Sequence, residues 1–377
     1  MIYFDNAATT FPKPDVVLEK TFDFAKNHCA NPGRSAHNMS VISSRAVYEC
    51  REAICELING DDISNVAFTK NCTEALNIGL LSALGDGDDV ISSVLEHNSI
   101  IRVLEHLKKT KNITVTYLRP NQDMLIRAED VRANIKKNTK LIALCHANNL
   151  VGTVNEIEKI GKVARDNNIL FLLDAAQSIG KIDIDVKKMN IDILCAPGHK
   201  ALFGLSGTGF IYAGKNVKLS PILYGGTGSF SDEINEIEIM PDKLETGTVN
   251  VVGIKSMLEG IKFIKKEGID AIFEKENEMT KYFIQRLSTV RDVIIYTPNN
   301  NVLSSIVSFN IKNKDSSLIC SSLNYKYDVA VRGGLHCNPF GHEFLDTLES
   351  GFVRASLSYF NTKEEIDYFT NSLNILD

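Results

Sequence analysis

Short apolar runs alternate with helical patterns between residues 75 and 215 of this chain. Each run is bounded by Gly, Asp or Asn, as buried strands commonly are. The segments between the runs repeat apolar residues at helical spacing, and in 157–167 the residues Ile157, Ile160 and Ala164 share one face. Strands that alternate with helices predict an α/β fold, in which helices cover both faces of a mostly parallel sheet. The expected strands are 89–94, 141–145, 169–173, 191–196 and 209–213.

The pattern changes after a long expected helix at 251–267. The elements expected beyond it are a helix at 274–287, strands near 305–311 and 327–331, and a last helix from Lys363. The tract 298–301, which reads Pro-Asn-Asn-Asn, is expected to be a turn or surface loop. A chain of 377 residues is long enough for about two domains. We therefore expect an N-terminal arm (1–15), a large domain (16–259) and a smaller C-terminal α+β domain (260–377).

Composition and charge exclude several classes of function. The hydrophobic content of 44% and the charged content of 23% are ordinary for a soluble globular protein. The formal net charge of -6 argues against a nucleic-acid partner, and short basic pairs such as Lys108-Lys109 are typical of solvated faces. No apolar run approaches the roughly 18 residues of a membrane-spanning helix. The start of the chain lacks a basic region followed by an apolar stretch, so no secretory signal is expected.

The eight cysteines are scattered along the chain without a CxxC pair. In a chain of this length without a signal sequence, that pattern predicts free thiols in a reducing cytoplasm. Cys145 and Cys195 lie in apolar runs and are expected to be small buried hydrophobic residues. A metal site is not expected, because no two-plus-two Cys/His spacing is present.

Lys200 and Asp174 form the first candidate pair for catalysis. Asp174 directly follows the apolar run 169–173, and Lys200 follows the next expected strand. A lysine that carries an aldehyde cofactor as an imine needs an acid for the cofactor's pyridine nitrogen. Ligands of parallel sheets lie beyond the carboxyl ends of the strands, where His97 and His146 are also expected. We therefore expect these side chains to converge, although Lys200 taken singly also fits a surface lysine.

Three more polar residues near this sheet edge each allow two interpretations. Thr73 is a plausible N-cap of a helix whose free N–H groups would bind a phosphate, or it caps a helix that has no ligand. His97 can stack on an aromatic ring and exchange protons near neutral pH, or it is structural. Asn149 offers an amide to a ligand, or it is a turn residue.

Eight motifs along the chain, in their sequence order, resemble those of the class V, fold-type I pyridoxal phosphate (PLP) enzymes. Within that class they resemble the cysteine desulfurase/selenocysteine lyase family. The resemblance spans essentially the whole chain, and it implies the fold-type I transferase architecture. The motifs are 3–10 (YFDNAATT), 72–77 (CTEALN), 96–99 (EHNS), 174–177 (DAAQ), 198–200 (GHK), 245–248 (ETGT), 332–337 (RGGLHC) and 353–356 (VRAS).

The resemblance implies roles for four residues around the cofactor ring. Lys200 is expected to hold PLP as an imine, and Asp174 to pair with the pyridinium nitrogen. Gln177 is expected to hydrogen-bond the ring oxygen, and His97 to stack on the ring and take part in catalysis.

The same resemblance implies residues for the phosphate and the substrate. Phosphate binding is implied for Thr73, His199 and, from the neighbouring subunit of a homodimer, Thr248. Substrate-carboxylate binding is implied for Asn149, Arg354 and Arg332. The family usually has Ser or Thr where this chain has Pro197, so one phosphate-facing hydroxyl is missing. Either cofactor affinity is lower, or Thr73 and Thr248 compensate.

Cys337 decides which reaction is expected. It follows two glycines and precedes Pro339, which predicts a tight loop. By resemblance, Cys337 is the nucleophile that takes sulfur from L-cysteine as a persulfide and leaves L-alanine; its other interpretation is a half-buried thiol at a domain junction. The Arg-x-Gly-x-His-Cys pattern resembles a shorter-loop subgroup that tends to need a sulfur-acceptor protein. Asn338 replaces the family's usual Ala, and 339–342 resembles a less characterised branch.

Several alternatives remain open. The same residues would serve a selenocysteine lyase or another Cβ–S or Cβ–Se lyase. A class V aminotransferase or epimerase would use the same cofactor on other substrates. A PLP-binding scaffold or sulfur-shuttle subunit would have little catalysis of its own.

Overall fold

The structure, a computed structural model, describes residues 1–377 except 34–36, 228–233, 236, 300–302 and 376–377. Its centre is a seven-stranded sheet in which β8 runs antiparallel to both neighbours while the other pairs are parallel. The predicted α/β fold with a mostly parallel sheet is therefore confirmed. In sheet order the strands are β2 (Val66–Thr69), β8 (Gly209–Ala213), β7 (Ile193–Pro197), β6 (Leu170–Asp174), β5 (Thr139–Cys145), β3 (Asp89–Ser93) and β4 (Thr114–Leu118).

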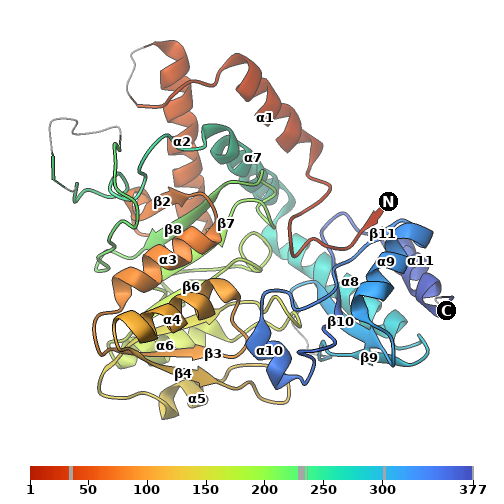
Figure 1. The fold of residues 1–377 in the computed structure, drawn as a ribbon. Helices are drawn as coiled ribbons and strands as arrows, with labels where there is room; N and C mark the ends of the chain where they lie inside the picture. The colour runs from red at the N-terminus through yellow and green to blue at the C-terminus, as the bar shows by residue number, and fades with distance from the viewer. Residues whose placement is uncertain (34–36, 228–233, 236, 300–302, 376–377) are drawn as a thin grey trace.

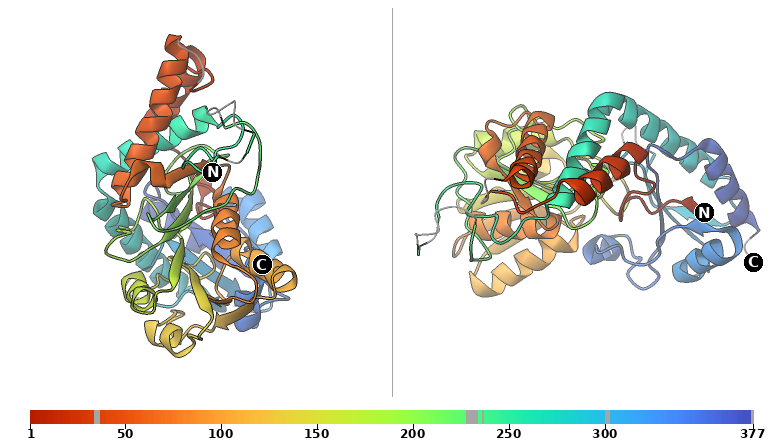
Figure 2. Two further views of the ribbon diagram at one scale, coloured as in Figure 1. Left: turned by 90° about the vertical axis from the view of Figure 1, so that its left-hand side faces the viewer. Right: turned by 90° about the horizontal axis from the view of Figure 1, so that it is seen from above.

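Each face of this sheet has its own apolar core, because successive side chains of a strand point to opposite faces. Leu173 belongs to the core under α6 and α7, whereas its neighbour Leu172 belongs to the core under α3 and α4. Burial on both faces makes the central strands continuous apolar runs, which is why their sequence pattern is clear. Figures 1 and 2 show helices on both sides of the sheet. The helices up to this point are α1 (Asp15–Asn27), α2 (Asn38–Leu57), η1 (Ile63–Asn65), α3 (Cys72–Ala83), α4 (Asn98–Thr110), α5 (Ala128–Ala133), α6 (Ile157–Asp166) and α7 (Val251–Glu267).

A three-stranded antiparallel sheet forms in the C-terminal part, with β10 between β12 and β9. Its core includes Phe283 and Phe369, and Phe4 from the start of the chain packs against both rings. The N-terminal strand β1 pairs in parallel with β11, so the first residues are part of this unit (Figure 1). The elements are β1 (Ile2–Tyr3), α8 (Ile269–Leu287), β9 (Val293–Ile295), β10 (Ile306–Ile311), α9 (Ser316–Tyr327), β11 (Val329–Ala330), α10 (Pro339–Phe344), β12 (Val353–Ser356) and α11 (Lys363–Asn374). The division at residues 15 and 259 stays a prediction.

Two expected elements of the C-terminal part are wrong in their bounds. The strand predicted at 327–331 is only β11, because α9 continues to Tyr327 and Asp328 then turns the chain with a φ of 54°. The helix predicted from residue 274 begins at Ile269, directly after Gly268, whose φ of 89° ends α7. The helices predicted at 251–267 and from Lys363 are confirmed. In the tract 298–301, residues 300 and 301 lie outside the described residues.

The eight cysteines are all free, and Cys145 and Cys195 are buried as predicted. Among the described residues, no helix is both long and apolar enough to cross a membrane. The same residues contain no group of three His, Cys, Asp or Glu side chains placed to hold a metal ion.

Candidate active site

A cavity of about 190 Å³ lies at the carboxyl ends of β5, β6 and β7. Parallel strands that end together at one edge bring residues distant in sequence to one place. The predicted residues that line this cavity are Thr73, His97, Asn149, Asp174, Gln177, His199 and Lys200. His146 does not line it; its buried side chain lies elsewhere, although its backbone N–H donates to the Asp174 carbonyl at 2.9 Å.

Asp174 and Lys200 bring opposite charges to the lining of the cavity. Asp174 ends β6, between Cys145 of β5 and Cys195 of β7, and its Oδ1 accepts the Ala176 N–H at 2.9 Å. Burial raises the pKa of Asp174, against the lowering effect of the Lys200 ammonium. Burial also lowers the pKa of Lys200, so its amine is easier to deprotonate than a surface lysine. Within the described residues the Lys200 amine has no hydrogen-bond partner.

The N-terminus of α3 forms one wall of the cavity, but its cap is not the predicted Thr73. Asn71 is the N-cap, since its Oδ1 accepts the Glu74 N–H at 2.9 Å. Thr73 lies in the first turn, where its hydroxyl shares a 2.8 Å hydrogen bond with Ser99. The backbone N–H groups of Cys72 and Thr73 have no acceptor in the described part of the chain. Free N–H groups at a helix N-terminus suit a phosphate.

His199, on the turn that follows β7, and Pro197, the last residue of β7, form another wall of the cavity. The buried Nδ1 of His199 has no hydrogen-bond partner among the described residues. Burial lowers the pKa of His199 to about 4, so its ring is neutral at pH 7. Pro197 ends β7 opposite Gly209 and brings no hydroxyl, whereas Thr73 and Ser99 each bring one to the same cavity. The unpaired groups on both walls fit a phosphorylated cofactor.

His97 is both the N-cap of α4 and a wall of the cavity. Its Nδ1 accepts the Ser99 N–H at 3.1 Å and lies 2.9 Å from the Ser99 hydroxyl. Burial lowers the pKa of His97 to about 4, and the nearby Lys200 acts in the same direction. His97 is therefore a neutral imidazole at pH 7, and its proton lies on Nε2, because Nδ1 is an acceptor.

Arg354 and Asn149 form a polar corner beside the cavity. The buried Arg354 donates to the Asn149 carbonyl at 2.9 Å and to Asp5 at 3.3 Å, and its Nε has no partner among the described residues. Arg332 is beside Arg354, and their backbones exchange hydrogen bonds of 3.2 and 2.8 Å. The Asn149 amide donates to the His336 carbonyl at 2.8 Å, which ties this corner to the Cys337 loop.

Cys337 and His97 both line a cleft that adjoins this cavity. The predicted tight loop is present, with φ values of 50° at His336 and 58° at Cys337. The Asn98 N–H donates to the Cys337 carbonyl at 2.8 Å, so the loop contacts the start of α4. Burial lowers the pKa of His336 to about 2, and its Nε2 lies 3.0 Å from the Phe352 carbonyl.

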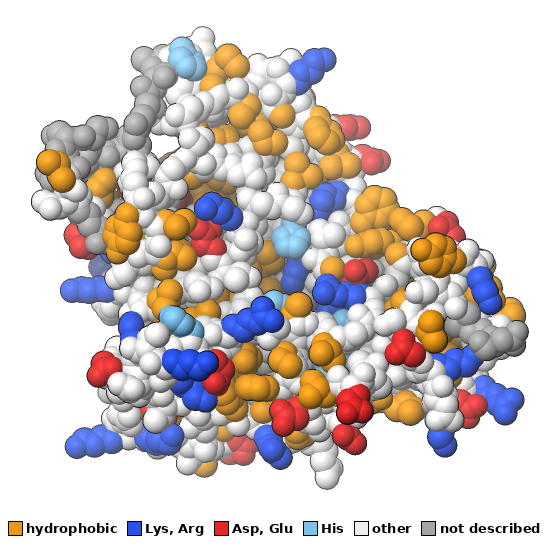
Figure 3. Space-filling model, in the orientation of Figure 1, with side chains coloured by type: hydrophobic (Ala, Val, Ile, Leu, Met, Phe, Trp, Pro, Cys, Tyr) orange, Lys and Arg blue, Asp and Glu red, His pale blue; other side chains and the backbone are white. Residues whose placement is uncertain are grey.

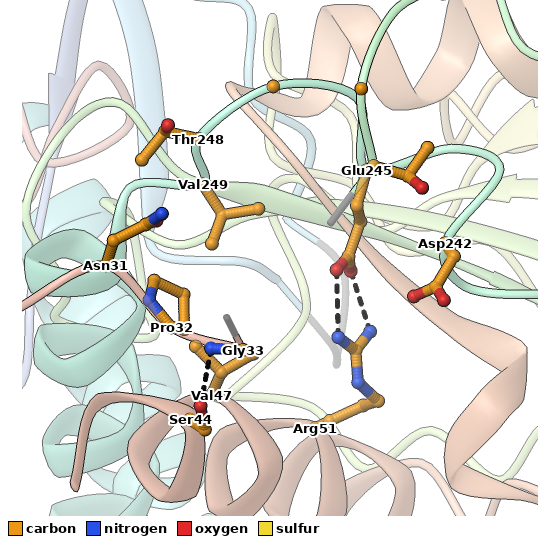
Figure 4. A pocket seen from close by; sticks show the side chains of 13 residues that line it. Asn31, Pro32, Gly33, Ser44, Val47, Arg51, Asp242, Glu245, Thr248 and Val249 are labelled. Atoms are coloured by element: carbon orange, nitrogen blue, oxygen red, sulfur yellow. Dashed lines mark hydrogen bonds and ion pairs between the residues drawn. The ribbon is translucent and has the colours of Figure 1, made fainter. Parts of the chain in front are cut away.

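Thr248 lies apart from the cavity. It lines a separate pocket with Asn31, Gly33 and Val249, above an ion pair between Arg51 and Glu245 (Figure 4). Its predicted contact with a phosphate therefore needs a second copy of the chain, and stays a prediction.

Sequence reasoning missed three residues at this site. Ser99, which bonds both Thr73 and His97, lies inside a recognised motif but has no signal of its own. Cys72 places its sulfur 3.7 Å from Asp174 Oδ1, a contact that the helical pattern around it does not reveal. Asn71 competes with Thr73 as a cap two positions away, and both residue types are good N-caps.

An acid and a lysine at neighbouring strand ends, beside an open helix N-terminus, are what an α/β enzyme with a phosphorylated aldehyde cofactor requires. The chain belongs to the class-V aminotransferase family, whose model matches residues 2–369. Enzymes of this family depend on pyridoxal phosphate. The predicted family resemblance is thereby confirmed.

Relatives with assigned names match along almost the whole chain. The probable cysteine desulfurase of Pyrococcus abyssi is 32% identical, over 100% of this chain and 94% of that protein. The probable cysteine desulfurase of Borreliella burgdorferi is 33% identical, over 98% of this chain and 90% of that protein. The apo structure of the cysteine desulfurase from Thermococcus onnurineus NA1 has a TM-score of 0.92 at 28% identity, covering 99% of this chain and 94% of that one.

Proposed function

We propose that this protein is a PLP-dependent cysteine desulfurase, which converts L-cysteine to L-alanine and keeps the sulfur as a persulfide on Cys337. One observation carries the proposal beyond the family. Cys337 and His97 line the same cleft, and His97 also lines the cavity that holds Lys200 and Asp174. A thiol is thus held at the entrance of a cavity built for the cofactor, where the sulfur of a bound cysteine can meet it.

Different residues bind different parts of the cofactor. Lys200 is the residue for the covalent bond, Asp174 for the pyridine nitrogen, and Gln177, whose amide donates to the Ala7 carbonyl at 3.0 Å, for the ring oxygen. The α3 N-terminus, Thr73 and His199 are the phosphate site. When bound, PLP supplies an electron sink for the substrate Cα.

The reaction is a balanced transfer between two thiols. Arg354, Arg332 and Asn149 orient the substrate carboxylate, because a guanidinium fork matches both carboxylate oxygens. The Lys200 amine, with its lowered pKa, accepts the Cα proton. The Cys337 thiolate then attacks the substrate sulfur, so an S–S bond forms as the Cβ–S bond breaks. The electron pair and one proton go to Cβ, which becomes the methyl group of alanine, and the Lys200 ammonium returns its proton to Cα.

The proposal also includes a homodimer and a cytoplasmic location. It divides the chain into an arm, a large domain and a small domain at residues 15 and 259. The eight free thiols support a reducing compartment. Thr248 supports a homodimer, since within one chain it lies away from the cavity it is expected to complete.

The test is Cys337→Ala beside Cys29→Ala, which removes another half-buried free thiol. Alanine formation from cysteine should be lost in Cys337→Ala and kept in Cys29→Ala, with the cofactor absorbance present in both. Undiminished turnover in Cys337→Ala would refute the persulfide. Selenocysteine turnover that survives in this variant would instead support a lyase, and keto-acid products would support an aminotransferase.

A further inference from the structure

A second cleft leads from the active site along the groove between α3 and α4. Its cavity volume is about 520 Å³, and it shares Thr73, His97 and Ser99 with the cofactor cavity. We call it the α3–α4 cleft; it is lined by Asn77 and Leu81 of α3, by Asn98, Arg102 and His106 of α4, and by Cys337 at its inner end. It therefore connects the Cys337 thiol with the surface.

The charge of this cleft contrasts with that of the chain. The net charge is -6, yet no Asp or Glu is among the described residues that line the cleft. Asn98, Arg102 and His106 follow one another at intervals of four residues, so they share one face of α4. Arg102 is exposed and has no acidic partner in the described part of the chain. Figure 3 shows arginine, lysine and histidine side chains over α3 and α4.

The acid nearest in sequence does not neutralise this face. Glu105 accepts hydrogen bonds from Lys108 at 3.0 Å and from the Tyr117 hydroxyl at 2.9 Å, and so points away from the cleft toward β4. Arg102 therefore brings a positive charge to the cleft that no acid among the described lining residues neutralises, and such a charge attracts anionic partners.

Hydrogen bonds to its backbone hold the Cys337 loop in place. Left-handed backbone at His336 and Cys337 persists only where the surroundings fix it. Here Asn98 binds the Cys337 carbonyl, Asn149 binds the His336 carbonyl, and Asn338 is fully buried. An acceptor must consequently enter the cleft to reach the sulfur.

We propose that the α3–α4 cleft is the docking site for an acidic, cysteine-bearing segment of a sulfur-acceptor protein. The proposal rests on the proposed function, which supplies the persulfide. The thiolate of the acceptor attacks the outer sulfur of the Cys337 persulfide. A new S–S bond forms on the acceptor, the bond between the two sulfurs on Cys337 breaks, and Cys337 leaves as a thiolate. The exchange needs no external oxidant or reductant.

Three peptides of equal length test the charge preference: acetyl-Glu-Cys-Glu-amide, acetyl-Ser-Cys-Ser-amide and acetyl-Lys-Cys-Lys-amide. The holoenzyme is loaded with the Cys337 persulfide by one equivalent of cysteine and freed of small thiols. The rate of peptide persulfide formation is then followed by mass spectrometry. We expect the acidic peptide to react about three- to tenfold faster than the basic one at low salt, and the difference to shrink at high salt.

Arg102→Glu should invert this order, since it reverses the charge at the mouth of the cleft, whereas general damage to the fold would slow all three peptides alike. Lys137→Glu, an exposed charge reversal at the opposite, amino end of β5, should leave the order unchanged. Equal rates for the three peptides, or an unchanged order in Arg102→Glu, would overturn the proposal. Equal rates for 2-mercaptoethanesulfonate and the acidic peptide would also overturn it, because a free anionic thiol would then suffice. Failure to load any persulfide would instead identify the proposed function as the error.

Discussion

The side-chain amide of Asn338 donates a 2.7 Å hydrogen bond to the backbone carbonyl of Leu95. This bond joins the residue after Cys337 to the segment before His97. The same side chain caps α10, because its Oδ1 accepts the Gly341 N–H at 2.9 Å. Asn338, the position at which this chain departs from the family's usual Ala, thus links the loop that carries Cys337 to the segment that leads into His97.

The variants Asn338→Ala and Asn338→Ser distinguish the hydrogen bond to Leu95 from the cap of α10. Both variants lose the bond to Leu95, whereas Ser retains a good helix cap. We expect kcat for alanine formation to fall about tenfold in both, with a smaller change in KM, since a misplaced nucleophile slows the chemical step. The rate at which iodoacetamide alkylates Cys337, followed by mass spectrometry, should change as well. A normal kcat in the Ser variant would show that the cap alone matters.

Arg354→Lys tests the substrate-carboxylate site. Lysine keeps the positive charge but lacks the planar fork, and it cannot bind Asn149, Asp5 and a carboxylate together. We expect KM for L-cysteine to rise about 10- to 100-fold, as for the loss of one bidentate contact. Arg132→Lys, on the exposed end of α5, is the matched control. An unaltered KM in Arg354→Lys would place the carboxylate elsewhere.

The sequence predicted those parts of the site that follow from strand ends. Asp174 and Lys200 converge because β6 and β7 are adjacent parallel strands, and continuous apolar runs mark such strands. The edge strand β4 (Thr114–Leu118) was missed, because it is only partly buried and lacks the continuous apolar run that marks the central strands. The Asn338–Leu95 bond joins residues 243 positions apart, and no local pattern encodes a contact of that kind. The cap of α3 differed by two residues because Asn71 and Thr73 both suit that role.

Glu96 should make stability depend on pH in the direction opposite to acid denaturation. Burial raises the pKa of Glu96 from 4.5 to about 8, while Ser93 and Cys145 donate hydrogen bonds to it. A folded pKa above the unfolded value means that the folded state holds the proton more tightly. This stabilisation is complete below pH 4.5 and is lost as the pH rises through 8.

Glu96→Gln removes this titration but can still accept from Cys145. We expect the difference in the free energy of unfolding between the variant and the wild type, measured with urea, to shift in favour of the variant as the pH rises. The shift should be up to about 1.4 kcal/mol per pH unit between about pH 5 and pH 8. Glu129→Gln, in the exposed first turn of α5, is a control for removal of a carboxylate. Parallel stability profiles for Glu96→Gln and the wild type would contradict the raised pKa.

Arg51 and Glu245 hold the loop that carries Thr248. Their side chains form two hydrogen bonds of 2.7 and 3.0 Å (Figure 4). Glu245 also accepts the Phe68 N–H at 2.7 Å. Arg51→Met leaves a largely buried carboxylate without its partner, so we expect the free energy of unfolding to fall by about 3 kcal/mol. If Thr248 completes the phosphate site of a second copy, the dissociation constant for PLP, measured by absorbance, should rise as well.

The double variant Arg51→Met/Glu245→Gln distinguishes a specific pair from general loss of packing. Because the introduced glutamine side chain is neutral, it needs no counter-ion, and its carbonyl can still accept the Phe68 N–H. We therefore expect the double variant to be more stable than the sum of the two single effects predicts, by at least about 1 kcal/mol in urea unfolding. Additive effects would show that Arg51 acts through its other contacts rather than through the carboxylate. These contacts are its hydrogen bond to the Val66 carbonyl and the Phe68 ring, whose centroid lies 4.7 Å from the guanidinium carbon.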